Sequence, residues 1–239
     1  MADNQNRAVK RLDQFLAECF DLSRSIAGRE VKQGRVEVNG TVVKSPNEKV
    51  AVGDLIKFRE IETKVYDKLY YMLNKPEGYV CANDDATYPI VFTLLSEEYG
   101  SASCHCVGRL DLDTTGLVLL TNDGQWSHRV ASPKKHLGKT YEVTLDEPIS
   151  DEAIEQLKNG VMLRGEKKPT SPADVEKLDD CRLLLTIYEG KYHQVKRMMA
   201  AVGNAVTALN RVSIGGLKLD PSLALGEYRA LTEEEIAMF

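Results

Sequence analysis

The sequence has little of what secreted or membrane-spanning proteins depend on. Its 239 residues include only five cysteines, an odd number without the regular spacing of a disulfide framework. It shows no charged leader followed by an apolar core, and no apolar run approaches the roughly 20 residues that cross a bilayer. We therefore expect a reduced, cytoplasmic protein without a membrane segment.

The sequence also lacks an excess of positive charge. Its net charge of -5 argues weakly against a nucleic-acid partner, because phosphate contacts use Lys and Arg. The charge is uneven, however: residues 24–35 carry four basic side chains against one acid, and residues 125–141 carry four Lys or Arg and no acid. An acidic total can thus hide basic faces, although ordinary solvated charge explains each run equally well.

The first 60 residues predict a compact unit of helices and strands. In RLDQFLAECF the apolar residues fall on one helical face, and Ser23 can cap a second helix that ends at Gly34. RVEVNGTVVK alternates about an Asn-Gly pair, which is a strong hairpin signal, and GDLIKF supplies another strand. Residues 61–68 are polar, show no apolar period and are expected to form a linker.

Residues 69–239 predict a larger α+β domain with a mixed, largely antiparallel sheet. The clearest strand patterns are KLYYML, LVLLTND, KTYEVTL and RLLLTI, and strands predominate over helices without alternating regularly with them. Helices are expected around residues 126–130, after a Ser150 cap, over residues 192–202, and in a capping box that starts at Thr232.

The stretch GRLDLDTTGLVLL places Asp111 and Asp113 just before an apolar strand. A calcium loop is excluded, because apolar side chains and Asn122 occupy the later ligand positions. A phosphatase of the haloacid dehalogenase kind, which carries D-x-D-x-T, is a closer alternative. That fold needs a buried parallel strand directly before the first aspartate, whereas this chain has CHCVGRL there.

Two further motifs carry weaker signals. Cys104-His105-Cys106 contains metal-ligating residue types, but zinc sites usually combine a C-x2-4-C pair with a second pair, and the sequence has none. We therefore expect no bound metal. Lys75 in NKPEG is either a phosphate contact or part of a tight turn whose angles Pro and Gly set.

Four motifs in order, NKPEG, GRLDLDTTGL, KTYEV and GKYHQVKRM, resemble those of the pseudouridine synthases. The N-terminal unit resembles the S4-type RNA-binding domain, and GQWSHRVASP and GEYRALTEEEI resemble the RsuA-type branch, which acts on small-subunit ribosomal RNA. The resemblance implies an S4-like domain over residues 1–60, a linker over 61–68 and a catalytic domain over 69–239. It further implies that a uridine of 16S ribosomal RNA is isomerised to pseudouridine.

The resemblance also assigns the catalytic residues. It implies Asp111, after G-R-L, as the catalytic carboxylate and Tyr141, in K-T-Y, as the ring that stacks on the target base. Lys196, after H-Q-V, is implied as the paired cation, and because many relatives carry Arg there, Arg197 stays open as the partner of Asp111. Asp113 matches no essential position and is expected to brace the turn.

The expected RNA contacts lie in both domains. In the S4-like unit the basic residues of the second helix and its end suit contacts with the phosphates of structured RNA. The full set of expected RNA-binding residues is Arg24, Arg29, Lys32, Arg35, Lys75, Arg109 and Arg197.

The chemistry agrees with the resemblance. Pseudouridine forms when the N1–C1′ bond breaks, the uracil rotates and C5 joins C1′, without net redox change or a lost leaving group, so no cofactor is expected. A carboxylate can attack C1′ or remove the C2′ proton, and a paired cation keeps it ionised against desolvation.

Several alternatives stay open from the sequence. They are the same chemistry on large-subunit RNA, an RNA-binding ribosome assembly factor without activity, and the D-x-D-x-T phosphatase. The expected partner is ribosomal RNA, free or in a partly assembled subunit, and the chain is expected to act as a monomer.

Overall fold

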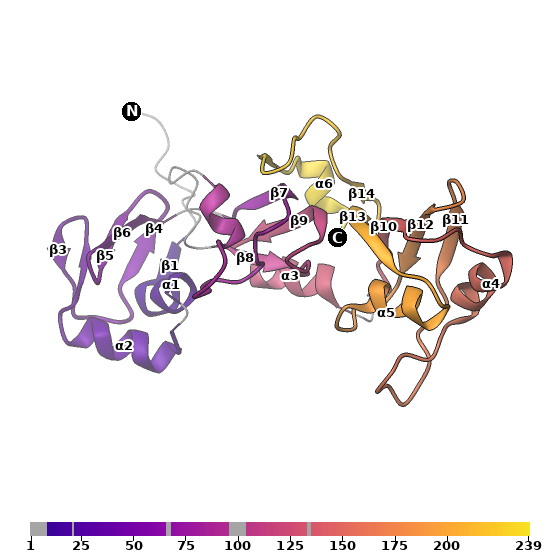
Figure 1. The fold of residues 1–239 in the computed structure, drawn as a ribbon. Coiled ribbons are helices and arrows are strands. Elements are labelled where there is room, and N and C mark those ends of the chain that lie inside the picture. The colour runs from indigo at the N-terminus through magenta and orange to yellow at the C-terminus, as the bar shows by residue number, and fades with distance from the viewer. Residues whose placement is uncertain (1–8, 21, 66–67, 96–103, 133–134) are drawn as a thin grey trace. The chain divides into compact units, whose positions relative to one another are not determined.

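The structure is a computed structural model, and it describes residues 9–20, 22–65, 68–95, 104–132 and 135–239 (Figure 1). The chain divides into two compact units. The first consists of Met1–Leu69, Leu95–His105 and Thr121–Asp123, and the second of Tyr70–Leu94, Cys106–Leu120 and Gly124–Phe239. No helix of the described residues is long and apolar enough to cross a membrane.

The first unit combines two helices with a small antiparallel sheet. The side chain of Ser23 accepts a hydrogen bond from the N–H of Ile26 and so caps the second helix, as predicted. Asn39 and Gly40 both have positive φ and form the predicted hairpin turn. The elements are β1 (Val9–Arg11), α1 (Leu12–Cys19), α2 (Arg24–Lys32), β2 (Val36–Val38), β3 (Thr41–Val42), β4 (Lys49–Ala51), β5 (Leu55–Phe58) and β6 (Ile61–Lys64), with sheet order β3-β2-β5-β6 and a separate β1-β4 pair.

The segment expected to be a linker is partly a strand. Ile61–Lys64 forms β6 and pairs antiparallel with β5, Phe58 opposite Ile61. The sequence pattern did not predict this strand, because only Thr63 of its four residues is buried and the other three are exposed. Arg59 and Glu60 adopt positive φ and make the turn between the two strands. The linker prediction is therefore wrong for residues 61–64.

The second unit is built on a mixed sheet, which confirms the α+β prediction. Within the described residues its strands follow the order β11-β12-β10-β13-β9-β7-β15, with β14 paired to β13 and β8 to β9. Strand β13 runs antiparallel to β10 and parallel to β9. The strands are β7 (Tyr70–Lys75), β8 (His105–Val107), β9 (Thr115–Thr121), β10 (Lys139–Leu145), β11 (Asp174–Lys177), β12 (Arg182–Ile187), β13 (Val206–Ile214), β14 (Leu217–Lys218) and β15 (Tyr228–Ala230).

Two helices of the second unit, α4 and α6, begin at the caps that the sequence predicts, whereas α3 begins two residues before its predicted start and α5 two residues after. Ser150 caps α4 through the N–H of Ala153, and Thr232 and Glu235 form a complete capping box. Between the strands lie η1 (Val91–Leu94), α3 (Gly124–Ala131), α4 (Asp151–Asn159), α5 (Gln194–Ala201) and α6 (Glu233–Ala237).

Apolar packing fixes the part of the sheet that carries the site. Trp126 of α3 is fully buried against Leu117 and Leu119 of β9 and Ile214 of β13, and its indole N–H donates to the carbonyl of Ile236 at 3.0 Å. This core holds β9 in place, and the residues around Asp111 lead directly into β9, so that segment ends on a packed strand.

Candidate active site

Residues 108–114, called here the aspartate loop, connect β8 to β9 and carry Asp111. Lys75, at the end of β7, lies beneath this loop with none of its surface exposed. Its ammonium donates to the carbonyls of Thr114 at 2.8 Å, Leu112 at 3.2 Å and Pro76 at 3.0 Å. Burial lowers the pKa of Lys75, so these charge-assisted bonds are what offsets its desolvation.

The expected contact between Lys75 and RNA does not fit this geometry. A side chain that is fully buried and holds three carbonyls has no ammonium surface left for a phosphate. The other interpretation of NKPEG, a structural turn, describes what Lys75 does: it fixes the main chain of the aspartate loop.

A second buried cation, Arg211 of β13, holds the other side of the loop. Only 1% of its surface is exposed. Its guanidinium donates to the carbonyls of Gly108 at 2.9 Å, Arg109 at 3.5 Å and Leu117 at 2.8 Å. Lys75 therefore holds the main chain after Asp111, and Arg211 holds the main chain before it. No local sequence pattern indicates the Arg211 contacts.

Two further contacts hold the aspartate loop close to the sheet. The N–H of Leu110 donates to the sulfur of the buried Cys81 at 3.5 Å. At the start of β9, Gly116 has φ 102°, and a Cβ there would lie 2.4 Å from the carbonyl oxygen of Arg211. Only glycine allows β9 to approach β13 this closely.

Lys196 of α5 connects the two aspartates of the loop. Its Nζ lies 2.5 Å from Oδ1 of Asp113 and 3.4 Å from Oδ2 of Asp111. The buried face of α5 carries Val195, Met198 and Met199, which leaves Lys196 on the side toward the loop. The structure thus pairs Asp111 with Lys196 and not with Arg197.

The charges around Lys196 keep it cationic. Burial pulls the pKa of Lys196 down, but the hydrogen bond to Asp113 and the charge of Asp111 outweigh it and leave that pKa raised. The hydrogen bond from Lys196 in turn lowers the pKa of the Asp113 carboxyl. The Lys196 ammonium therefore contacts both carboxylates of the aspartate loop.

His193 adds a second group on Asp111. Its Nε2 lies 3.5 Å from Oδ1 of Asp111, whereas Lys196 lies nearest to the other oxygen, Oδ2. His193 is the residue before α5 and adopts a left-handed conformation with φ 47°, an uncommon angle for a residue with a side chain. Sequence reasoning missed His193, although it lies in the motif GKYHQVKRM.

Tyr141 lies on β10, in the middle of the sheet. It is 8% exposed and pairs across the sheet with Arg211, the residue whose guanidinium holds the aspartate loop. The pairing of β10 with β13 is irregular between Thr140 and Tyr141, and such irregularities re-aim side chains near active sites. Strands β10 and β13 therefore carry both the Tyr141 ring and Arg211, the side chain that holds the aspartate loop.

Arg197 braces the protein itself. Its guanidinium donates to the carbonyls of Tyr192 at 3.0 Å and Arg164 at 2.8 Å and lies 3.3 Å from a carboxylate oxygen of Glu166. Its expected contact with RNA is thus replaced by contacts that fix the loop before α5. Arg109, by contrast, is exposed beside Asp111.

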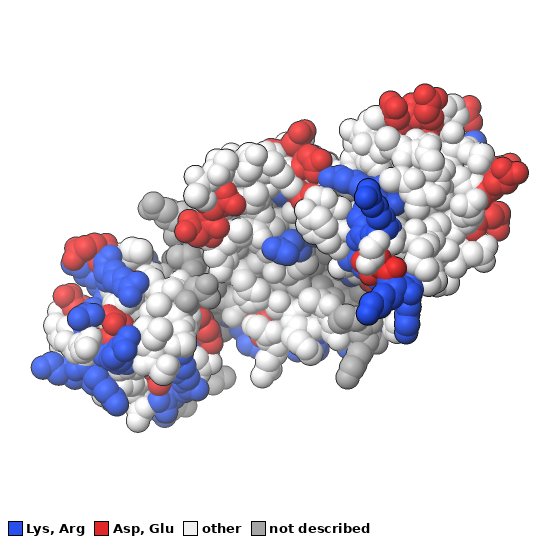
Figure 2. Space-filling view, turned by 60° about the horizontal axis from the view of Figure 1, so that its bottom comes forward, with Lys and Arg blue, Asp and Glu red and all other residues white. Residues whose placement is uncertain are grey.

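The four expected RNA-binding residues of the first unit are all exposed. Arg29 and Lys32 lie on the side of α2 away from the buried Ala27 and Val31, whereas Arg24 begins the helix and its guanidinium lies 3.5 Å from the buried carboxylate of Asp13. Arg35 follows the helix and lies 3.0 Å from the buried Glu30. Figure 2 shows Lys and Arg side chains gathered over this unit on the face that it draws.

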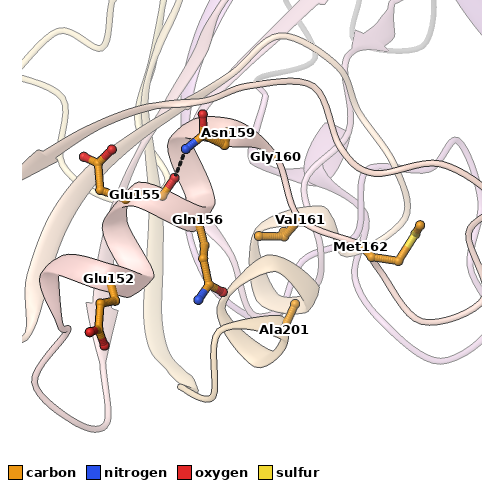
Figure 3. A pocket seen from close by; sticks show the side chains of 8 residues that line it. All are labelled: Glu152, Glu155, Gln156, Asn159, Gly160, Val161, Met162 and Ala201. Atoms are coloured by element: carbon orange, nitrogen blue, oxygen red, sulfur yellow. Dashed lines mark hydrogen bonds between the residues drawn. The ribbon is translucent and has the colours of Figure 1, made fainter.

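A separate hollow of about 570 Å³ between α4 and α5 does not belong to this site. Figure 3 shows that its lining includes two carboxylates, Glu152 and Glu155, and no cationic side chain, which is unsuited to RNA. The lining residues are Glu152, Glu155, Gln156, Asn159, Gly160, Val161, Met162 and Ala201. Among the described residues, no cluster of three His, Cys, Asp or Glu has the geometry to hold a metal ion.

Comparison with known proteins agrees with this geometry. The family model of RNA pseudouridylate synthases matches residues 69–201, and the model of the S4 domain matches residues 10–56. A crystal structure of a pseudouridylate synthase, 49% identical, superimposes with a TM-score of 0.70 over 95% of this chain and 98% of the other.

Two curated relatives carry the name ribosomal small subunit pseudouridine synthase A. The protein from Haemophilus influenzae is 51% identical over 95% of this chain and 97% of its own length, and the one from Escherichia coli K12 is 50% identical over 95% and 98%. These matches leave the phosphatase interpretation without support. The chain belongs to the RNA pseudouridylate synthase family, with an S4 domain ahead of its catalytic domain.

Proposed function

We propose that this chain isomerises a uridine of small-subunit ribosomal RNA to pseudouridine. The choice of RNA is supported by the names of relatives that are 50% and 51% identical over nearly their whole length. The observation that carries the chemistry is the Lys196 ammonium 3.4 Å from the Asp111 carboxylate, in a loop that two buried cations hold in place.

The Asp111 carboxylate starts the reaction. It either attacks C1′ or removes the C2′ proton, and in both routes the N1–C1′ bond breaks and the uracil is freed. The Lys196 ammonium, 3.4 Å away, offsets the negative charge of the Asp111 carboxylate when RNA excludes water from the site. After the uracil rotates, C5 joins C1′ and the C5 proton leaves, so the product has the same atoms as the substrate.

Tyr141 holds the freed base. A target uridine extruded from its RNA reaches Asp111 with one face of the uracil against the Tyr141 ring, and base-on-ring stacking keeps the uracil in place while it rotates. The hydroxyl of Tyr141 then assists in removing the C5 proton. The location of Tyr141 opposite Arg211 on β13 supports this role, since Arg211 also holds the loop of Asp111.

The first unit supplies RNA affinity. Arg24, Arg29, Lys32 and Arg35 are exposed on and just after α2, where they suit phosphate contacts. The proposed catalytic groups Asp111, Tyr141 and Lys196 all belong to the second unit of one chain, which supports the proposal that the protein acts as a monomer. We place its action in the cytoplasm, where its proposed RNA substrate is found.

The test uses the purified full chain and three substrates: naked small-subunit RNA, a partly assembled small subunit and naked large-subunit RNA. Pseudouridine is mapped at each position of each RNA, with excess EDTA present to remove metal ions. The proposal requires new pseudouridine at one site of small-subunit RNA. Product on large-subunit RNA alone would reassign the substrate, and binding without product would favour an inert assembly factor.

A further inference from the structure

Tyr192, next to the catalytic site, carries an aromatic ring that the fold does not cover. It exposes 75% of its surface, the highest value among the exposed large hydrophobic residues of the described chain. A single exposed apolar side chain needs no special explanation. Three further observations distinguish Tyr192 from the others.

First, the Tyr192 ring is part of a stack that leads to the catalytic carboxylate. It lies parallel to the imidazole of His193, with 3.7 Å between the ring centroids and 20° between the planes. The same imidazole lies 3.5 Å from Asp111. The outer face of Tyr192 is therefore two side chains away from the group that acts on the target nucleotide.

Second, the main chain of this segment is braced. Arg197 donates to the carbonyl of Tyr192 at 3.0 Å, and its guanidinium is itself held by Glu166 and the carbonyl of Arg164. The side chain of Gln194 accepts from the N–H of Lys191 at 2.8 Å. A ring on a fixed backbone loses little conformational entropy on binding, which favours its use as a binding surface.

Third, the charges beside the ring suit an anionic polymer. Arg164, Lys167 and Lys168 are exposed and belong to the segment whose main chain Arg197 contacts, whereas Lys191 and Arg197 are paired with Glu166 and Lys196 with Asp113. Planar rings among cations are what proteins use to bind single-stranded nucleic acid, since every base has a face to stack.

We infer that the exposed face of Tyr192 stacks on an RNA base that flanks the target uridine, with His193 as the second layer of the stack. This inference rests on the proposed function, because it needs the target uridine at Asp111. The stacked base fixes the strand beside the extruded nucleotide, so Tyr192 contributes to RNA binding and not to the bond-breaking step.

The experiment measures single-turnover pseudouridine formation on a small-subunit RNA fragment against protein concentration, which separates half-saturation from maximal rate. Tyr192→Ala should raise the half-saturating concentration roughly tenfold or more, as loss of one base stack does, with the maximal rate within about threefold. Tyr192→Phe and Tyr192→Trp should stay near wild type, because each keeps a flat ring.

The matched control is Met162→Ala. Met162 is also exposed, at 57%, but it lines the acidic hollow of Figure 3, so its loss should leave both parameters unchanged. If Tyr192→Ala binds RNA like wild type, the inference fails and the ring serves a partner of another class. If Phe fails like Ala, the hydroxyl and not the stack is what matters, and the inference also fails.

A second readout keeps this test apart from the proposed function. RNA fragments with 2-aminopurine at positions flanking the target uridine are bound to the Asp111→Asn protein, which needs no turnover. Stacking on Tyr192 should quench the fluorescence at one flanking position, and adding Tyr192→Ala to that protein should abolish the quenching. Quenching without pseudouridine formation by wild type would sink the proposed function alone, and formation without any quenching would sink the stacking inference alone.

Discussion

Lys196 lies closer to Asp113 than to Asp111: its Nζ is 2.5 Å from Asp113 and 3.4 Å from Asp111. The aspartate that matches no essential family position is thus the nearer partner of Lys196. We therefore propose that Asp113 does more than brace a turn, because it positions Lys196 beside Asp111, the proposed catalytic carboxylate.

Replacing Asp113 tests this positioning role. In Asp113→Asn the ammonium loses its nearer carboxylate, and we expect turnover to fall roughly tenfold, since small misplacements of a catalytic group cost up to about 100-fold. Single-turnover rates with a thermal melt as the folding check measure it. A wild-type rate would reduce Asp113 to a turn residue, and a loss equal to that of Asp111→Asn would make it a second catalytic group.

Lys75 should prove structural when it is replaced by methionine. Lys75→Met leaves three carbonyls without their donor, which costs about 3 kcal/mol and lowers Tm by roughly 6–12 °C. Thermal melts give the result, with Lys167→Met as the control because Lys167 is exposed. An unchanged Tm together with weaker RNA binding would restore the phosphate contact expected from the sequence.

The exposed face of α2 should dominate the salt dependence of RNA binding. Arg29→Gln and Lys32→Gln should each lower the slope of log K against log salt by about one, because each lost phosphate contact releases one counterion fewer. Filter binding across a salt series measures the slope. Lys158→Gln is the control, since Lys158 pairs with Glu155 on α4. Unchanged slopes for the α2 variants would move the RNA contact elsewhere.

Asp220 predicts a pH-dependent contribution to stability near the C-terminus. Hydrogen bonds from the Ser222 hydroxyl and N–H, and from Arg229, lower the pKa of Asp220 from 3.8 to about 2. Since the folded-state pKa is the lower one, the stabilisation is present above about pH 4 and is lost as the pH falls toward 2. Melts from pH 3 to 7 should show the Tm gap between wild type and Asp220→Asn closing at low pH. A gap that stays constant would contradict this linkage.

The parts of the fold that sequence could predict are those set by neighbours in the chain. Ser23, Ser150 and Thr232 cap helices through residues three positions later, and the turn at Asn39 depends on two adjacent residues. Such signals are complete within a few residues. These capping and turn signals can therefore be recognised in the sequence without knowing how the chain packs.

The contacts that the sequence could not predict join residues that lie far apart along the chain. Arg211 looks like an ordinary strand residue, and its carbonyl partners lie 94 to 103 positions earlier. The buried role of Lys75 depends on carbonyls 37 and 39 positions later. Asp111 and Lys196 could be assigned only through the resemblance, because no local pattern brings residues 85 apart together.

Asp111→Asn is the decisive variant, because the proposed reaction depends on Asp111 as the catalytic carboxylate. The amide keeps the shape of the side chain and removes its charge, so single-turnover pseudouridine formation on small-subunit RNA should fall by about 10⁴-fold or more. Filter binding and Tm should stay near wild type, because the loop is held by Lys75 and Arg211. A folded Asp111→Asn protein that forms pseudouridine at the wild-type rate would contradict the account.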